Sequence, residues 1–207
     1  MANDRDVTAR AQIRNCALRL FGERGPDAVT VRDIAACANV SPGLVLHHFG
    51  SKQGLRDAVD AHVLSMFDAM LATAIEDPAA FAKGGTPQIS SFAELFASAI
   101  PAGSPIPAYL RRLLLSGDPM GKKLIQQWFE LTVTTVDALA ASGNLQPTQD
   151  RAALAAFLLV NDLAMIVLHD YVADALGTDP LSPEGMRRWA STAFDVYRHG
   201  AFTKEES

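Results

Sequence analysis

Apolar residues recur at the three-to-four-residue spacing of an amphipathic helix along nearly the whole chain of 207 residues. No run shows the sustained alternation of apolar and polar residues that marks a half-buried strand. Glycine and proline divide the chain into helical stretches of very different lengths. These patterns predict an all-α protein of about nine helices, and they exclude folds built on a sheet.

The N-terminal quarter carries the densest set of helix start and stop signals. The spacing predicts a first helix over residues 8–24, which ends at Gly25-Pro26. Thr30 and Asp33 have the spacing of a capping box, which opens a short second helix. A turn and further helices are expected to follow these two helices.

Asn39 tolerates a left-handed turn, so we expect the chain to reverse there. Ser41 and Pro42 then have the pattern of an N-cap followed by proline at the first helical position. They predict a third helix over residues 42–48, and Ser51 caps a long fourth helix. Two short helices joined by a tight turn and packed on a preceding helix form a helix-turn-helix.

This arrangement has a chemical consequence. Helix N-termini carry unsatisfied N–H groups and partial positive charge, so they favour phosphate. The small residues at the start of the third helix, Ser41, Pro42 and Gly43, allow a close approach to the major groove of DNA. The head of the chain is therefore predicted to bind double-stranded DNA.

Residues 10–59 resemble the tetracycline-repressor (TetR) family of bacterial transcription regulators. The resemblance lies in an ordered set of motifs: Leu20-Phe21, Arg24-Gly25, Thr30-Val31-Arg32-Asp33-Ile34-Ala35, Val40-Ser41-Pro42-Gly43-Leu44 and His48-Phe49-Gly50-Ser51-Lys52. It implies a three-helix DNA-binding domain over residues 1–56, on a larger helical bundle over residues 57–207 that binds a ligand and dimerises. The chain departs from the family pattern at Leu46, where a tyrosine is common, and at Asn39, which replaces a turn glycine.

The resemblance also implies roles for individual residues of the head. Thr30 and Arg32 would contact phosphate, and either of them could also contact a base. Ser41, Pro42, Gly43 and Leu44 would lie in or against the major groove. The residues that match backbone-phosphate contacts are His47, His48 and Lys52. Burial of His48 beside Phe49 in the core of the head is an alternative for that residue.

The charge is divided in the same way as the predicted domains. Residues 1–56 carry eight Lys and Arg against five Asp and Glu, a balance of +3. The remainder carries ten against eighteen, a balance of −8, and the two give the net charge of −5. A basic head on an acidic body indicates two units with different partners.

The helix predicted over residues 148–176 is apolar nearly all round, so it must be covered on every side. Its own bundle can cover one side and a second copy of the chain the other, as the resemblance implies. The candidate dimer residues are Leu159, Leu163, Ile166, Val167, Trp189, Phe194 and Tyr197. Burial of this helix within one monomer is the alternative.

The body also contains residues suited to a cavity for a mainly apolar effector. Asn161 and His169 share a face with Met165, and polar groups in an apolar face need partners, either in the protein or in a ligand. The candidate pocket residues are Met66, Met70, Phe92, Phe96, Tyr109, Trp128, Phe129, Asn161, Met165 and His169. Ordinary core positions are the alternative for each of them.

Other functional classes find no support in the sequence. The phosphate-loop, HExxH and GxSxG motifs do not occur, so no catalytic residue, metal ligand or cofactor is predicted. Cys16 and Cys37 lie in helical patterns without a CxxC motif, which suggests neither a disulfide nor a zinc site. The charged N-terminus and short apolar runs predict a cytoplasmic protein without signal peptide or membrane span.

The sequence therefore favours a homodimeric DNA-binding regulator, most simply a repressor, that leaves a palindromic operator when a small-molecule effector binds. Two alternatives remain open. One is an all-α small-molecule-binding protein or enzyme whose head is a protein-interaction module. The other is a DNA-binding regulator without an effector.

Overall fold

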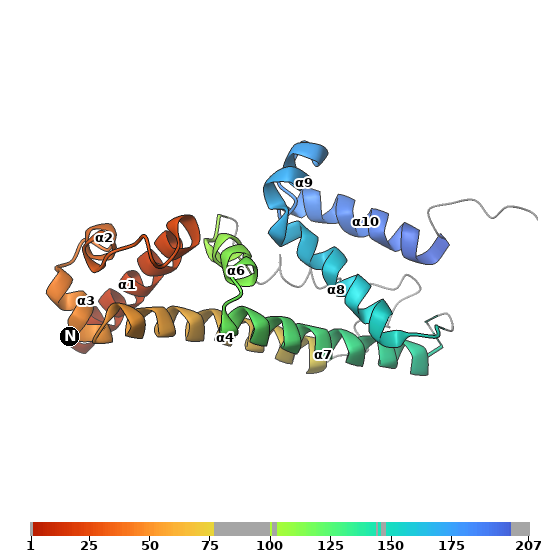
Figure 1. Ribbon diagram of the computed structural model, residues 1–207, viewed down its shortest axis with the longest axis horizontal. Helices are drawn as coiled ribbons and strands as arrows, with labels where there is room; N and C mark the ends of the chain where they lie inside the picture. The colour runs from red at the N-terminus through yellow and green to blue at the C-terminus, as the bar shows by residue number, and fades with distance from the viewer. Residues whose placement is uncertain (1, 77–99, 101–102, 144, 146–147, 200–207) are drawn as a thin grey trace, which may run out of the picture. The chain divides into compact units, whose positions relative to one another are not determined.

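The computed structural model describes residues 2–76, 100, 103–143, 145 and 148–199, and within these ranges it contains nine α-helices and no strand (Figure 1). The prediction of an all-α fold is confirmed. The candidate pocket residues Phe92 and Phe96 lie outside the described residues. The helices are α1 (Ala2–Arg24), α2 (Val31–Cys37), α3 (Pro42–Phe49), α4 (Lys52–Glu76), α6 (Ile106–Leu115), α7 (Pro119–Ala141), α8 (Arg151–Val167), α9 (His169–Leu176) and α10 (Pro183–His199).

The described residues belong to two compact units. The first contains residues up to 73 together with 103–130, and the second contains the remainder. The helix-turn-helix head is thus part of a larger packing unit that includes α6 and the first part of α7. The functional boundary predicted at residue 56 stays a prediction, because a packing unit need not coincide with a functional one.

The core of the first unit is built where α1, α2, α3 and the start of α4 meet. The fully buried side chains there include Ile13, Phe21, Ile34, Val45 and Leu55. These side chains come from four helices. Helices as short as α2 and α3, with seven and eight residues, are marginal alone, so burial of their apolar side chains against α1 and α4 stabilises them.

Helix α6 packs on the C-terminal part of α1 (Figure 1). A Cβ atom at Gly22 would lie 3.0 Å from the backbone nitrogen of Tyr109, so the two helices approach closely there. Arg112 of α6 donates from Nε to the carbonyl of Gly22 at 3.2 Å and from Nη2 to that of Glu23 at 3.1 Å. Carbonyls in the last turn of a helix lack partners within the helix, so Arg112 satisfies the end of α1.

In the second unit, the prediction of a single helix over residues 148–176 is wrong. This stretch is divided at Leu168 into α8 and α9, which are bent by 83°. No glycine or proline stands at the break, so tertiary packing accounts for it: Met165 and Met186 form a buried cluster against which Val172, Leu181 and Trp189 pack. Among the described helices no single one has the length and apolar character to cross a membrane, and only this bent pair meets that test jointly.

His169, at the start of α9, lies between two carboxylates. Its Nδ1 is 2.9 Å from Asp170 Oδ1 and its Nε2 is 3.0 Å from Asp179 Oδ1. Partial burial alone would lower the pKa of His169, but the hydrogen bonds to Asp170 and Asp179 raise it above its ordinary value. This candidate pocket residue therefore links the start of α9 to Asp179, in the turn that leads to α10.

The expectation for the cysteines is also wrong. Cys16 of α1 and Cys37 of α2 form a disulfide, with their Cα atoms 5.9 Å apart. Spacing along the chain gave no sign of it, because the pair is brought together by the packing of two helices.

Candidate nucleic-acid interface

The capping box that opens α2 is confirmed. The backbone N–H of Asp33 donates to Thr30 Oγ1 at 3.1 Å, and the backbone N–H of Thr30 donates to Asp33 Oδ2 at 2.8 Å. The hydrogen bonds from the side chain and backbone of Thr30 hold the pKa of Asp33 below its ordinary value. The box therefore fixes where α2 begins, with Thr30 and Arg32 both exposed at that end.

The turn between α2 and α3 is confirmed as well. Asn39 adopts a φ of 52°, in the left-handed region that asparagine tolerates better than most residues. The backbone N–H of Leu44 donates to Ser41 Oγ at 3.2 Å, and Pro42 occupies the first turn of α3. These local devices set the direction in which α3 leaves the turn.

Burial along α3 separates a face toward the head from a face toward solvent. Val45 is fully buried, and Leu44, His48 and Phe49 are half-buried. The exposed face contains Ser41, Pro42, Gly43, Leu46 and His47. The four predicted groove residues thus lie at the N-terminal end of α3, three exposed and one half-buried, which is the end that reads bases in a helix-turn-helix.

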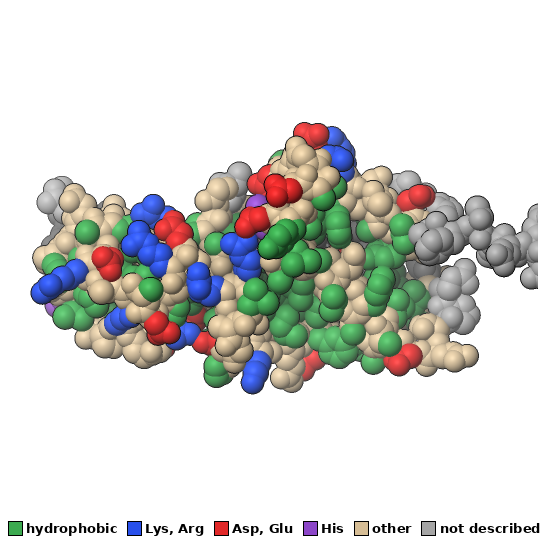
Figure 2. All heavy atoms as spheres, turned by 45° about the horizontal axis from the view of Figure 1, so that its top comes forward, with side chains coloured by type: hydrophobic (Ala, Val, Ile, Leu, Met, Phe, Trp, Pro, Cys, Tyr) green, Lys and Arg blue, Asp and Glu red, His purple; other side chains and the backbone are tan. Residues whose placement is uncertain are grey.

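The predicted phosphate contacts lie beside this face. His47 is exposed on α3, and Lys52 is half-buried at the first position of α4. Arg10 of α1 stacks on Phe49, with its Cζ 5.0 Å from the ring centroid, which places a further cation against the end of α3. Figure 2 shows Lys and Arg side chains over the N-terminal part of the molecule.

Two further residues belong to this site: Leu46, which the sequence marks only as a departure from the family pattern, and a glycine that sequence reasoning missed. Leu46 is 45% exposed on the same face as Gly43 and His47, and helical spacing from Gly43 places it there. Gly54 of α4 is the second: a Cβ atom there would lie 2.2 Å from the carbonyl oxygen of Phe49. That contact links the end of α3 to the start of α4, and no local signal distinguishes this glycine from others in the chain.

The candidate pocket residues differ in burial and in their polar partners. Trp128 and Met165 are fully buried, and Tyr109 is buried and donates a hydrogen bond to Asp60. Asn161 Nδ2 donates to Tyr197 Oη at 2.9 Å. Met66 is half-buried on α4, and the side chain of Met70 lies outside the described residues.

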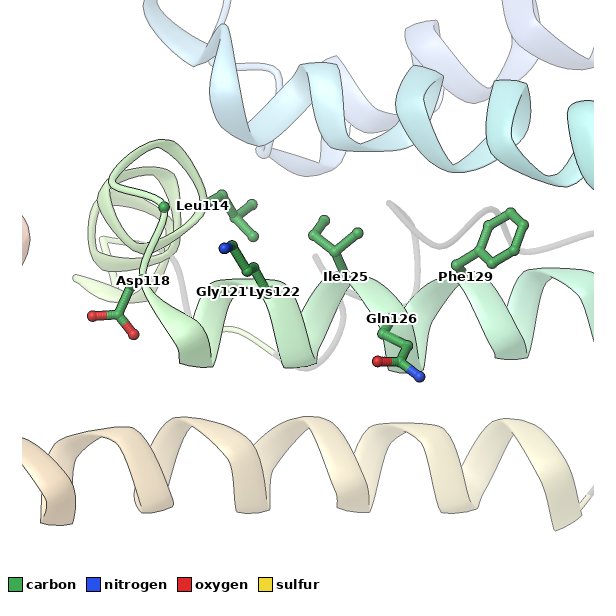
Figure 3. Close-up of a pocket in the computed structure, with 8 residues that line it drawn as sticks. Leu114, Asp118, Gly121, Lys122, Ile125, Gln126 and Phe129 are labelled. Atoms are coloured by element: carbon green, nitrogen blue, oxygen red, sulfur yellow. The ribbon is translucent and has the colours of Figure 1, made fainter.

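Two of these candidates line described cavities. Tyr109 borders one of about 420 Å³ beside Arg112, and Phe129 borders one of about 340 Å³ at the end of α6 and along α7. Leu114, Ile125 and Phe129 extend on the side of α7 that faces away from α4 (Figure 3). The other residues that line the cavity at Phe129 are Gly117, Asp118, Gly121, Lys122 and Gln126. The wall is thus mainly apolar, with one cation and one carboxylate at its edge.

The candidate dimer residues fall into two groups. Leu159, Leu163 and Ile166 are buried within their own chain, whereas Val167, Trp189 and Phe194 are half-buried. Tyr197 is exposed at 42%, although burial of its hydroxyl raises its pKa to about 12. Large apolar side chains are also exposed at positions outside the list of candidate dimer residues: Phe157, Val160, Leu168, Tyr171 and Val196.

Polar contacts join α4, α6 and the start of α7 within the first unit. Tyr109 of α6 donates to the buried Asp60 of α4, and Arg56 of α4 pairs with Asp118 just before α7. Burial raises the pKa of Asp60, and burial together with the hydrogen bond to Asp60 raises that of Tyr109. Helix α6 is thereby attached both to α1, through Arg112, and to α4.

A capped helix-turn-helix whose α3 exposes its N-terminal end, in a chain whose described elements are all helices, defines the class of helix-turn-helix transcription regulators. The family model for bacterial regulatory proteins of the tetR family matches residues 13–59. The model for the tetracycline-repressor-like C-terminal domain matches residues 103–203. The chain belongs to the TetR family.

Curated relatives and solved structures agree with this family assignment. The chain is 36% identical over 157 residues to the HTH-type transcriptional regulatory protein RaaS of Mycobacterium tuberculosis, a match that covers 75% of this chain and 68% of RaaS. It is 34% identical to the HTH-type transcriptional repressor Rv3405c of the same organism, over 67% of this chain and 62% of that one. A TetR regulator from Chloroflexus aurantiacus has the same fold, with a TM-score of 0.65 at 19% identity over 94% of this chain and 97% of that one.

Proposed function

We propose that this chain is a homodimeric repressor of the cytoplasm that leaves a palindromic operator when a small, mainly apolar molecule binds its body. The observation that carries the proposal is the exposed N-terminal end of α3, held by the caps at Thr30 and Ser41. Bases are read there, and the flanking cations contact the phosphate backbone.

Replacing Lys52 with alanine is expected to weaken DNA binding and to make its salt dependence shallower. Each lost phosphate contact reduces the slope of log K against log salt by about 1 per protomer. Fluorescence anisotropy across a salt series measures both effects, and His47→Ala tests the neighbouring contact. Lys123→Ala is the matched control, because Lys123 is exposed on α7 and its loss changes the charge equally. Unchanged slopes in both head variants would remove the phosphate assignment.

The case for a homodimer rests on exposed apolar side chains of the second unit. Phe157 and Val160 of α8 are 59% and 65% exposed, and Tyr171 of α9 is 77% exposed. Figure 2 shows hydrophobic side chains gathered on the face that α8, α9 and α10 present. Monomeric proteins seldom expose large contiguous apolar patches, and a two-fold interface would cover this one with its own copy.

Replacing Val160 with aspartate is therefore expected to shift the chain from dimer to monomer, because the interface would bury an unpaired carboxylate. Analytical ultracentrifugation at micromolar concentration measures the shift. Val160→Thr keeps the volume without the charge, so we expect a smaller loss. A wild-type chain that sediments as a monomer would contradict the proposed dimer.

The effector part of the proposal rests on the position of α6. Leu114 of α6 lines the cavity, and Arg112, two residues earlier, binds the last carbonyls of α1. A molecule that displaces α6 would therefore move α1 and the head attached to it. In a dimer this changes the separation of the two α3 helices, which must match half-sites about 34–36 Å apart.

Selection of bound duplexes from random DNA by the full chain tests the proposed function. We expect an inverted repeat whose half-sites are separated by one helical turn or a multiple of it. Enrichment of a single unrepeated half-site would contradict the dimer, and no enrichment at all would contradict sequence-specific binding.

A further inference from the structure

Cys16 and Cys37 are the two cysteines of the chain, and the proposed DNA and effector contacts involve neither. They lie on different helices of the head, 21 residues apart in the sequence, with a Cα–Cα distance of 5.9 Å that suits a disulfide. Both residues are half-buried, so neither is enclosed in the core of the head. The pair covalently joins α1 to α2, the helix that precedes α3.

Arg19 gives the two sulfur atoms different environments. Its Nη2 donates to Cys37 Sγ at 3.1 Å. A guanidinium beside a thiol favours the thiolate, which is the reactive form. When the pair is reduced, Cys37 is therefore the attacking cysteine and Cys16 the resolving one. In the reducing cytoplasm a disulfide is uncommon, and those that form there are usually redox-sensing or catalytic.

We propose that Cys16 and Cys37 form a reversible thiol–disulfide switch that controls DNA binding, with a low-molecular-weight disulfide as oxidant. The thiolate of Cys37 attacks one sulfur of the small disulfide and expels a small thiolate. The thiolate of Cys16 then attacks the Cys37 sulfur, closes the protein disulfide and releases a second small thiolate. The two protons lost by the cysteines pass to the two released thiolates, so one small disulfide becomes two thiols.

The oxidised state favours DNA binding because the disulfide restrains α2. This helix has seven residues and buries Ile34 and Ala35 as its anchors. Helix α3 follows it after the short turn at Asn39, so the orientation of α3 depends on that of α2. In the reduced protein a smaller fraction of molecules holds α3 in the binding orientation, and the apparent affinity falls by that fraction.

The test uses the full chain in buffers of reduced and oxidised glutathione and has two readouts, free thiols and DNA binding. The second readout rests on the proposed function. Alkylation and mass spectrometry count the free thiols, and anisotropy measures affinity for a duplex selected by the oxidised protein. We expect the oxidised chain to bind about tenfold more tightly than the reduced chain. The double variant Cys16→Ser with Cys37→Ser is expected to bind like the reduced chain in both buffers.

Arg19→Gln separates a switch from a merely structural bridge. Without the guanidinium we expect the pair to oxidise severalfold more slowly at neutral pH. Arg187→Gln, at an exposed position on α10, is the matched control and should oxidise at the wild-type rate. A pair that stays reduced at every glutathione ratio overturns the switch, as do equal or reversed affinities of the two forms. If neither the oxidised nor the reduced form retains any duplex, the proposed function is overturned, and the switch with it.

Discussion

Replacing Trp128 with alanine is expected to lower the free energy of unfolding by about 3–5 kcal/mol. Trp128 of α7 is fully buried, and its ring meets that of Phe67 of α4 edge-on, with the centroids 5.1 Å apart. The substitution removes this ring contact and leaves a cavity that the surrounding side chains fill only in part. Urea unfolding followed by circular dichroism, at a fixed protein concentration, measures the loss.

Phe129→Ala is the matched control for Trp128, because it removes the neighbouring aromatic ring from the same helix. Phe129 is half-buried and borders the cavity, so its loss is expected to cost less than half as much. Equal losses in the two variants would contradict the assignment of Trp128 to the core and Phe129 to the cavity wall.

Replacing Gly54 with alanine is expected to abolish specific DNA binding and to destabilise the head by about 1–3 kcal/mol. The added methyl carbon would lie 2.2 Å from the carbonyl oxygen of Phe49, a backbone atom that no rotamer change can move. The end of α3 and the start of α4 must therefore separate, and α3 loses its orientation. Thermal unfolding and anisotropy with the selected duplex measure the two effects.

Gly43→Ala provides the contrast, because it makes the same chemical change on a neighbouring helix. The nearest atom to its added carbon is Ser41 Oγ at 3.8 Å, so the fold has room for it. We expect stability to be unchanged or to rise by up to about 1 kcal/mol, while the methyl group weakens close approach to DNA. A stable Gly54→Ala that still binds DNA would contradict the tight contact with Phe49.

The local structure of the head was predictable from the sequence because its signals span only a few residues. The capping box of Thr30 and Asp33, the left-handed Asn39 and the Ser41 cap all occur as expected. Each depends on hydrogen bonds or backbone preferences within three residues, so tertiary contacts do not alter them.

Features that depend on distant residues were not predictable in this way. The break at Leu168 accompanies packing of Val172 on Met165 and Met186, and the disulfide joins residues on two helices. Burial of Leu159, Leu163 and Ile166 was one of two alternatives that periodicity left open, because an apolar helix face does not reveal what covers it. One of the two carboxylate partners of His169 likewise lies ten residues away, at Asp179.

The hydrogen bonds from Arg112 to the last turn of α1 bear on the engineering of chimeric regulators. A head grafted by its first 56 residues onto a foreign sensor would leave the carbonyls of Gly22 and Glu23 without their guanidinium donor. It would also lose the helix that packs against Gly22. The transferable specificity cassette is therefore discontinuous in the sequence: it consists of the helix-turn-helix together with the α6 segment that carries Arg112.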